Sequence, residues 1–204
     1  MSIVNPQYFF KADFIRPNMI GGRNYKAVKM PDGKTWLAEN LDLKWEGLII
    51  GGSHTAEPRA LYYSNNEELY GIDGERHCGL LYNYGAALYL QEHREELCKG
   101  WHLPTVEDWY GLLTKLKYNA KVLKGSDIDW ATDWNGTDDY GFNVLPCGYN
   151  NGSGFYSIGS NANIWSITPS SNNYYYYFNC GKSDTAYVNG NHQFMCYSIR
   201  LIKD

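Results

Sequence analysis

After Tyr118 the sequence consists of short apolar and aromatic runs, each ended by Gly, Asn, Ser or Pro. This pattern is typical of short β-strands joined by turns. The composition agrees with it, because 21 Gly and 19 Tyr in 204 residues, with 20% charged residues, favour a turn-rich fold containing β-sheet over a helical bundle. The predicted strands are 141–149, 154–158, 164–168, 174–179, 185–188 and 194–202.

A hairpin is predicted near the start of the chain. Residues 31–34, Pro-Asp-Gly-Lys, have the chemistry of a tight turn, so 25–30 and 35–38 are expected to pair as antiparallel strands. The stretch 44–79 has no sustained period. We expect it to be a long ordered loop region with a small hairpin at 61–64.

Two helices are predicted between this loop region and Tyr118. The first is expected at 81–97, where apolar residues recur at helical spacing. The second is expected to begin after Thr105, a good N-cap, with Asp108 three residues later as in a capping box. Its apolar face would consist of Val106, Trp109, Leu113 and Leu116.

Together these elements predict an α+β fold. No linker or low-complexity segment divides the sequence, so we expect residues 1–20 to be an N-terminal extension and 21–204 to form a single domain. The tail strand at 197–202 is expected to pair with the early hairpin. Four tryptophans are expected in the core: Trp36, Trp101, Trp109 and Trp165.

The charge of the chain argues against nucleic acid as a partner. The net charge is −4, and Lys and Arg form no stripe that could follow a phosphate backbone. No run is long and apolar enough to span a membrane, and residues 1–18 lack the pattern of a signal peptide. We therefore expect a soluble chain without a leader.

Five cysteines are present, and none forms a C-x-x-C pair. An odd number with wide spacing favours buried free thiols in a reducing compartment, while one or two disulfides remain the alternative. They are Cys78, Cys98, Cys147, Cys180 and Cys196.

Residues 170–194 are unusually rich in three residue types. Of 25 residues, 13 are Ser, Asn or Tyr, and only Lys182 and Asp184 carry a formal charge. Tyr offers a large, stiff contact area with a polar tip, and Ser and Asn offer adaptable hydrogen bonds, as in antibody paratopes. The stretch is therefore either a displayed binding surface or a Tyr-rich sheet facing its own core.

Several sequence words, taken in order, resemble the Fibrobacter succinogenes major paralogous domain. The resemblance covers about residues 20–204 and implies a relative of the formylglycine-generating, sulfatase-modifying family with a C-type lectin-like fold. That fold would have two helices, a small antiparallel sheet and long ordered loops. The words are GKTWLAENL (33–41), GLLYNYGAA (79–87), CKGWHLPT (98–105), GTDDYGF (136–142), WS (165–166) and SIRLI (198–202).

The C-terminal region also resembles the variable proteins of diversity-generating retroelements. A Trp-Ser-x-Thr-Pro entry at 165–169 precedes the Tyr-rich stretch, and Ser-x-Arg-Leu-x-Lys at 198–203 follows it. Asn, Tyr, Ser, Asp and His are the residues that an Asn codon yields when its adenines are replaced. A non-variable member of the family is the alternative. The resemblance implies a ligand-binding variable region at about 165–204, with contacts from Asn172, Asn173, Tyr174, Tyr175, Tyr176, Asn179, Tyr187, Asn189, Asn191 and His192.

We expect no catalytic residues, no metal and no cofactor. The closely spaced, copper-binding cysteine pair of the enzymatic relatives is missing, and the calcium motifs of sugar-binding lectins are matched only by Glu57-Pro58, before the helices. The histidines near Cys78 and Cys98 lack zinc-site spacing. One acidic run offers oxygen ligands for a structural Ca²⁺, although turns and caps explain it better: Asp127, Asp129, Asp133, Asp138 and Asp139.

The function expected from these observations is non-enzymatic binding of a macromolecular ligand, a cell-surface protein or glycan, through 170–194. The resemblance implies a phage tail-fibre tip or a bacterial surface as the setting, with a homotrimer as one way to gain avidity. The alternatives are an invariant cell-surface or carbohydrate-binding domain, a structural domain of a surface assembly, and a sulfatase-modifying type of enzyme.

Overall fold

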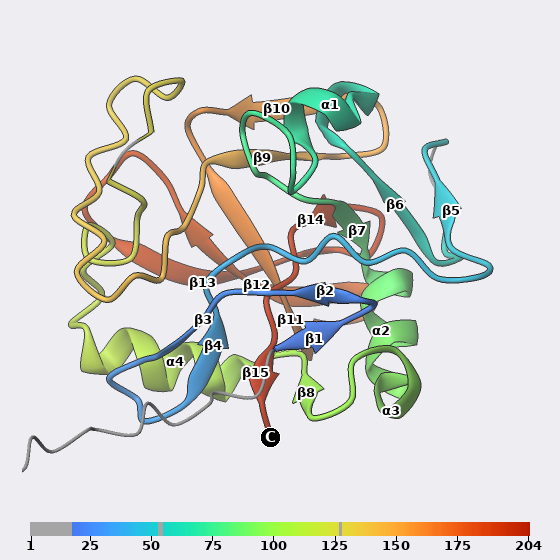
Figure 1. Ribbon diagram of the computed structural model, residues 1–204, viewed down its shortest axis with the longest axis horizontal. Coiled ribbons are helices and arrows are strands. Elements are labelled where there is room, and N and C mark those ends of the chain that lie inside the picture. Colours follow the sequence, from blue (N-terminus) through green and yellow to red (C-terminus); the bar gives the residue numbers. More distant parts are fainter. Residues whose placement is uncertain (1–17, 53–54, 127) are drawn as a thin grey trace, which may run out of the picture.

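The computed structural model describes residues 18–52, 55–126 and 128–204 (Figure 1). These residues form fifteen β-strands in three sheets and only four short α-helices. The expected α+β, C-type lectin-like arrangement, with two helices and a small antiparallel sheet, is therefore wrong, because the chain is mostly β. The physical reason is that segments predicted as loop or helix pair with strands far away in the sequence.

The largest sheet has nine strands and contains most of the Tyr-rich stretch at 170–194, in β11, β12 and β13. It is a mixed sheet, since β9–β11 and β5–β6 are parallel and its other strand pairs are antiparallel. One edge is β13 and the other is β5, while β10 pairs with β9 off the main path. In order the strands are β13 (Ala186–His192), β12 (Tyr174–Cys180), β11 (Ala162–Ser171), β9 (Cys147–Asn150), β14 (Cys196–Tyr197), β7 (Leu81–Asn83), β6 (Arg59–Leu61) and β5 (Ile49–Ile50), with β10 at Phe155–Ile158.

A four-stranded sheet joins the early hairpin to the tail of the chain. The hairpin is confirmed, because β3 (Ala27–Lys29) pairs antiparallel with β4 (Thr35–Leu37). The predicted pairing of the tail is confirmed as well, because β15 (Ile202–Lys203) lies between β4 and β8 (Trp101–His102). A third, two-stranded sheet consists of β1 (Met19–Ile20) and β2 (Arg23–Asn24). Most of the expected extension at 1–20 lies outside the described residues.

The second predicted helix is confirmed as α4 (Val106–Lys115), with its capping box. The first is only partly correct. Its first three residues form β7, which pairs with β6 and β14, and the Asn83 side chain then accepts the N–H of Ala86 to cap α2 (Tyr84–Glu92). The helix stops at His93, and a separate turn, α3 (Arg94–Leu97), follows.

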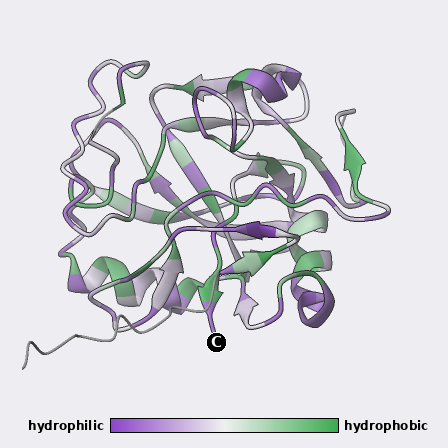
Figure 2. Cartoon of the chain, viewed as in Figure 1, coloured by the Kyte–Doolittle hydropathy of each residue, from purple (hydrophilic) through white to green (hydrophobic). Residues whose placement is uncertain are grey.

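The stretch 44–79 contains more secondary structure than predicted. It contains β5, β6, a 3₁₀ turn (Tyr63–Asn65) and α1 (Glu67–Tyr70), so the expected hairpin at 61–64 is absent from this described stretch. Figure 2 shows α1 and α3 as mainly hydrophilic, whereas β5 is hydrophobic along its length. No helix in the described part of the chain is long and apolar enough to cross a membrane.

The two longer helices pack on opposite faces of β11 and β12. Trp109 on α4 stacks on Phe178, with ring centroids 4.6 Å apart, and Trp36 lies 4.6 Å from Trp109. On the other face Tyr84 of α2 lies against Trp165. All four tryptophans expected in the core are buried, and the five cysteines are buried and free, as predicted.

The tail of the chain is held by a buried arginine. Arg200 is fully buried, and its Nε donates to the Asn40 side-chain oxygen at 2.8 Å. Its two terminal nitrogens donate to the backbone oxygens of Phe142 and Asn143. The predicted strand at 194–202 is interrupted between β14 and β15, where Ser198 forms an isolated parallel bridge with Ile164 and the backbone oxygen of Leu201 accepts the N–H of Leu37.

Candidate ligand-binding surface

The ten residues predicted to bind a ligand lie on β12, on β13 and in the turn that precedes β12. Asn172 and Asn173 form the tip of the β11–β12 hairpin, where both are exposed and Asn173 has a φ of +58°. Asn adopts this left-handed conformation more readily than most residues, so the turn suits it. The tip therefore presents two amide side chains to solvent.

Three of the predicted residues, Tyr174, Tyr176 and His192, lie on the face of the sheet that α4 covers at the other end of β12. The register pairs Tyr174 with His192 and Tyr176 with Gly190, so their side chains share this face. Tyr174 is 44% exposed, and its ring meets His192 edge to face at 5.5 Å. Tyr176 is half-buried. Deeper in the same row, Phe178 lies beneath α4, so this face is open only at the hairpin end.

The other five predicted residues lie on the opposite face. Tyr187 and Asn189 are exposed, and Asn191 is half-buried. Tyr175 is half-buried and stacks on Tyr84 of α2. Asn179 is buried, and its amide nitrogen donates to the side-chain oxygen of Asn163 at 2.6 Å. Its side chain therefore links β12 to β11 and is not exposed to a ligand. The predicted set is thus divided between two faces.

Four tyrosines on this second face are in ring contact, and a fifth, Tyr187, lies diagonally across from Tyr177 on β13. We call them the tyrosine row: Tyr156, Tyr149, Tyr197, Tyr177 and Tyr187. The ring centroids of Tyr156 and Tyr149 lie 5.7 Å apart, and those of Tyr149 and Tyr197 lie 6.1 Å apart. Those of Tyr197 and Tyr177 lie 4.7 Å apart. Its members belong to β10, β9, β14, β12 and β13. Tyr156 and Tyr187 are exposed (43% and 44%), Tyr149 is half-buried, and Tyr197 and Tyr177 are buried.

The tyrosine row is uncharged and partly fixed by hydrogen bonding. The Asn191 amide donates to the Tyr197 hydroxyl at 2.9 Å. Burial, with Tyr177 close by, raises the pKa of Tyr197, and burial with Tyr187 close by raises the pKa of Tyr177. Both hydroxyls therefore stay protonated at neutral pH, and they can donate and accept hydrogen bonds.

The charged residues of the Tyr-rich stretch lie at the far end of β12, in the turn to β13. Lys182 pairs with Asp133 at 3.2 Å, and Asp184 pairs with Lys121 at 3.0 Å. The buried Lys124 also holds this turn, because its side chain donates to the backbone oxygens of Lys182 and Ser183. The turn is thus tied to the body of the domain, away from the tyrosine row.

Two members of the tyrosine row, Tyr149 and Tyr156, were not among the predicted residues. They lie on the β9–β10 hairpin, before the Tyr-rich stretch. A signal was available, because 148–156 reads GYNNGSGFY and shares the Tyr, Asn, Ser and Gly composition of 170–194. The sequence could not show that only β11 separates the two segments in the sheet, or that Tyr197 of β14 joins their rings on one face.

The other candidate chemistries find little support in the geometry. No group of three or more His, Cys, Asp or Glu side chains within the described ranges is arranged to hold a metal ion. Of the acidic run, Asp127 lies outside those ranges, and Asp138 accepts the backbone N–H of Asn143 at 2.7 Å in a turn. His102 bonds Asp204 at 2.6 Å. Cys180 and Cys196 belong to separate core clusters.

Comparison with known proteins gives one match. The model of the Fibrobacter succinogenes major domain matches residues 29–203, which include β4, both longer helices and the whole tyrosine row. Neither the curated proteins nor the solved structures contain a match to the chain. The match covers most of the sequence, and the chain therefore belongs to the Fibrobacter succinogenes major domain family.

Proposed function

We propose that this protein binds a macromolecular ligand through the open part of the face that carries the tyrosine row. We define this tyrosine surface as Tyr149, Tyr156, Tyr187, Asn189 and Asn191. The observation that carries the proposal is the row itself: the exposed Tyr156 ring contacts Tyr149 and through it the buried rings of Tyr197 and Tyr177, and the exposed Tyr187 lies on the same face.

Such an arrangement suits recognition by contact area. A tyrosine offers a broad apolar ring and one hydroxyl at a small cost in conformational entropy, and Asn adds hydrogen bonds of either sense. Because the rings are already packed against one another, little ordering is needed when a ligand arrives. An uncharged, aromatic patch fits a protein or glycan surface better than a nucleic-acid backbone.

The finer part of the proposal is that the exposed positions vary between related copies of the gene. Exposed Asn and Tyr residues at the hairpin tip and on β13 are the types that adenine replacement in an Asn codon produces, as in the variable proteins that the C-terminal region resembles. The buried members, Tyr177 and Tyr197, would stay constant because they support the surface. The setting we propose is a phage tail tip or a bacterial surface, and the role is binding and not catalysis.

The binding proposal is tested with cells as the probe. Fluorescently labelled protein is applied to a panel of intact bacterial strains, and binding is measured by flow cytometry. For any strain that is bound, Tyr187→Ser and Tyr156→Ser should each weaken binding by about tenfold or more, as loss of a tyrosine hot spot does.

Tyr110 provides the matched control, because it is 42% exposed but lies on α4. Tyr110→Ser should leave binding unchanged. Equal losses from all three substitutions, or none from the first two, would show that the tyrosine surface is not the binding site.

The finer proposal is tested by sequencing this gene in many isolates of one community. Substitutions should concentrate at exposed positions of 170–194 and match adenines of a nearby template repeat. A uniform stretch with no repeat would leave a fixed ligand and remove the variable-protein interpretation.

A further inference from the structure

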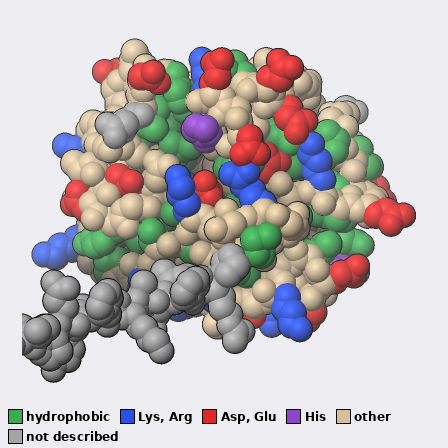
Figure 3. Space-filling model, viewed as in Figure 1, with side chains coloured by type: hydrophobic (Ala, Val, Ile, Leu, Met, Phe, Trp, Pro, Cys, Tyr) green, Lys and Arg blue, Asp and Glu red, His purple; other side chains and the backbone are tan. Residues whose placement is uncertain are grey.

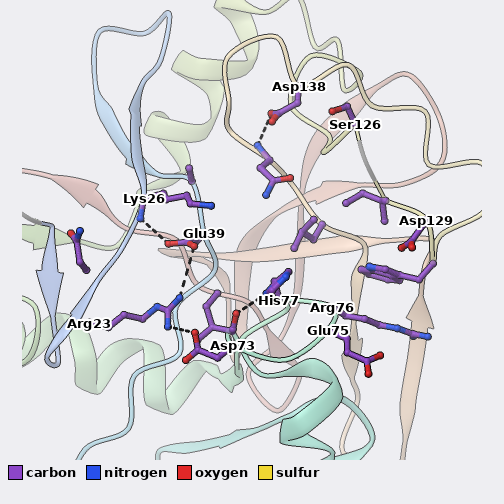
Figure 4. A pocket seen from close by; sticks show the side chains of 17 residues that line it. Arg23, Lys26, Glu39, Asp73, Glu75, Arg76, His77, Ser126, Asp129 and Asp138 are labelled. Carbon is purple, nitrogen blue, oxygen red and sulfur yellow. Dashed lines mark hydrogen bonds and ion pairs between the residues drawn. The ribbon is translucent and has the colours of Figure 1, made fainter.

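A second feature of the molecule, separate from the tyrosine surface, is a cleft of about 710 Å³. It opens between the β2–β4 region, the loop after α1 and the loop that leads to β9, and Figure 4 shows the side chains that line it. Its volume lies within the range of about 300–1,000 Å³ that is usual for small-ligand sites. None of its lining residues belongs to the tyrosine surface.

His77 is exposed in this cleft and has a fixed orientation. Its Nδ1 lies 2.9 Å from the backbone oxygen of Ile72, and since a carbonyl oxygen can only accept, Nδ1 carries the hydrogen. In the neutral ring the Nε2 lone pair is then free to accept a hydrogen bond from a ligand. The backbone of His77 has a φ of +49°, a conformation that Asn also tolerates.

Charges of both signs alternate around this histidine. Arg23 pairs with Asp73 at 2.6 Å and lies 4.0 Å from Glu39, so it offsets part of the negative charge on one wall of the cleft. The remaining groups include cations and carboxylates that form no ion pair with another described residue: Lys26, Arg76, Glu75 and Asp129. Figure 3 shows acidic and basic side chains interleaved on this face of the molecule.

This mixture decides against a strongly charged ligand. The lining contains three Arg or Lys side chains and five Asp or Glu side chains, a formal balance of −2. An anion would meet unpaired carboxylates, and a cation would meet the unpaired Lys26 and Arg76. A ligand whose groups each donate and accept hydrogen bonds can use both signs at once.

The cleft also has an apolar part. Trp130 is half-buried in its wall, and the Arg76 guanidinium lies over its ring, 5.1 Å from the centroid. Ile72 and Leu145 add aliphatic surface. Polar groups that converge beside an apolar wall are the usual composition of a small-ligand site.

We propose that this cleft binds a neutral saccharide. Each sugar hydroxyl can donate to Glu75, Asp129 or Nε2 of His77 and accept from Lys26 or Arg76, while the C–H faces of the ring pack against the apolar wall. A free neutral sugar and a sugar unit of a larger glycan share this chemistry, and the probes below separate them by length.

The experiment uses the full chain and ligand-detected NMR, with calorimetry for any sugar that binds. The probes are maltotriose, cellotriose, mannotriose, xylotriose and chitotriose, each beside its monosaccharide, together with inorganic phosphate, citrate and arginine methyl ester. We expect at least one neutral trisaccharide to bind, and the charged probes not to bind. A trisaccharide that binds much more tightly than its monosaccharide would identify a glycan segment and not a free sugar.

Two substitutions locate the site. His77→Asn keeps the left-handed backbone but removes Nε2, and Glu75→Gln keeps the shape of an exposed side chain while removing its charge. Each should raise the dissociation constant by about tenfold, the usual effect of losing one hydrogen bond to a charged or well-placed group. Circular dichroism and thermal melting establish that both variants are folded.

Tyr110→Ser is the control, because its exposed side chain lies on α4, outside both the cleft and the tyrosine surface, and it should leave sugar binding unchanged. The proposal is overturned if no neutral sugar binds, if a charged probe binds in its place, or if the two cleft substitutions have no effect. Since the cell assay tests the tyrosine surface and the sugar assay tests the cleft, failure of one proposal is distinguishable from failure of the other.

Discussion

Replacing Trp109 by Ala is the most direct test of how the tyrosine-bearing sheet is supported. Trp109 is fully buried, stacks on Phe178 of β12 with an interplanar angle of 21°, and contacts Trp36 of β4. Removing a large buried aromatic side chain costs about 3–5 kcal/mol. Since a domain is stabilised by only about 5–15 kcal/mol, Trp109→Ala should lose about a fifth or more of the free energy of unfolding.

The assay is urea unfolding followed by far-UV circular dichroism, with the change expected in the midpoint and not in the slope. Trp109→Phe is the matched variant. It retains a ring over Phe178 and removes an indole N–H that has no hydrogen-bond partner among the described residues. Leaving such a group unpaired is itself unfavourable, so Trp109→Phe should cost less than half as much. A loss below about 1.5 kcal/mol for Trp109→Ala would refute this account of the core, as would equal losses for the two variants.

Three further predictions concern the surface, a helix cap and the thiols. Tyr187→Ser should change the free energy of unfolding by no more than about 0.5 kcal/mol, because the side chain is exposed; a large loss in urea unfolding would show that this ring is part of the core. Burial acts to raise the pKa of Asp108, but its bonds from Lys34 and Thr105 outweigh burial and hold that pKa below its ordinary value. The stability from this group is therefore present above the ordinary pKa of 3.8 and is lost as the pH falls through the lower, folded value. Asp108→Asn should accordingly be less stable than wild type at pH 6, and the difference should shrink at about pH 3; a constant difference would contradict this. Burial raises the pKa of Cys180 to about 12, and the other four cysteines are also buried, so a thiol reagent at pH 8 should label none of the five in the folded protein and all five in urea.

Local signals in the sequence were sufficient for some elements of the fold. The capping box at Thr105 and Asp108 and the turn at 31–34 depend on neighbours within a few residues, and both were predicted correctly. The pairing of the tail with this hairpin was also predicted, because an early hairpin and a late strand can meet in one sheet.

Long-range pairing explains most of what was missed. Leu81 follows a helical pattern but belongs to β7, because β6 and β14 supply backbone partners that no local window contains. For the same reason the fold class was wrong. Composition located the Tyr-rich stretch, but burial of Asn179 depends on Asn163 in the facing strand, and the contribution of Tyr149 depends on Tyr197 of β14, whose ring contacts both Tyr149 and Tyr177.

The contacts of Arg200 mean that the Tyr-rich stretch depends on the residues that follow it in the sequence. Its guanidinium joins the tail to Asn40 near the early hairpin and to the backbone at Phe142 and Asn143, and β15 completes the four-stranded sheet. A gene copy in which a stop codon arises within 170–194 therefore encodes a chain that lacks these contacts and cannot complete its core. Such a product would not fold, so full-length translation is a condition for forming the tyrosine surface.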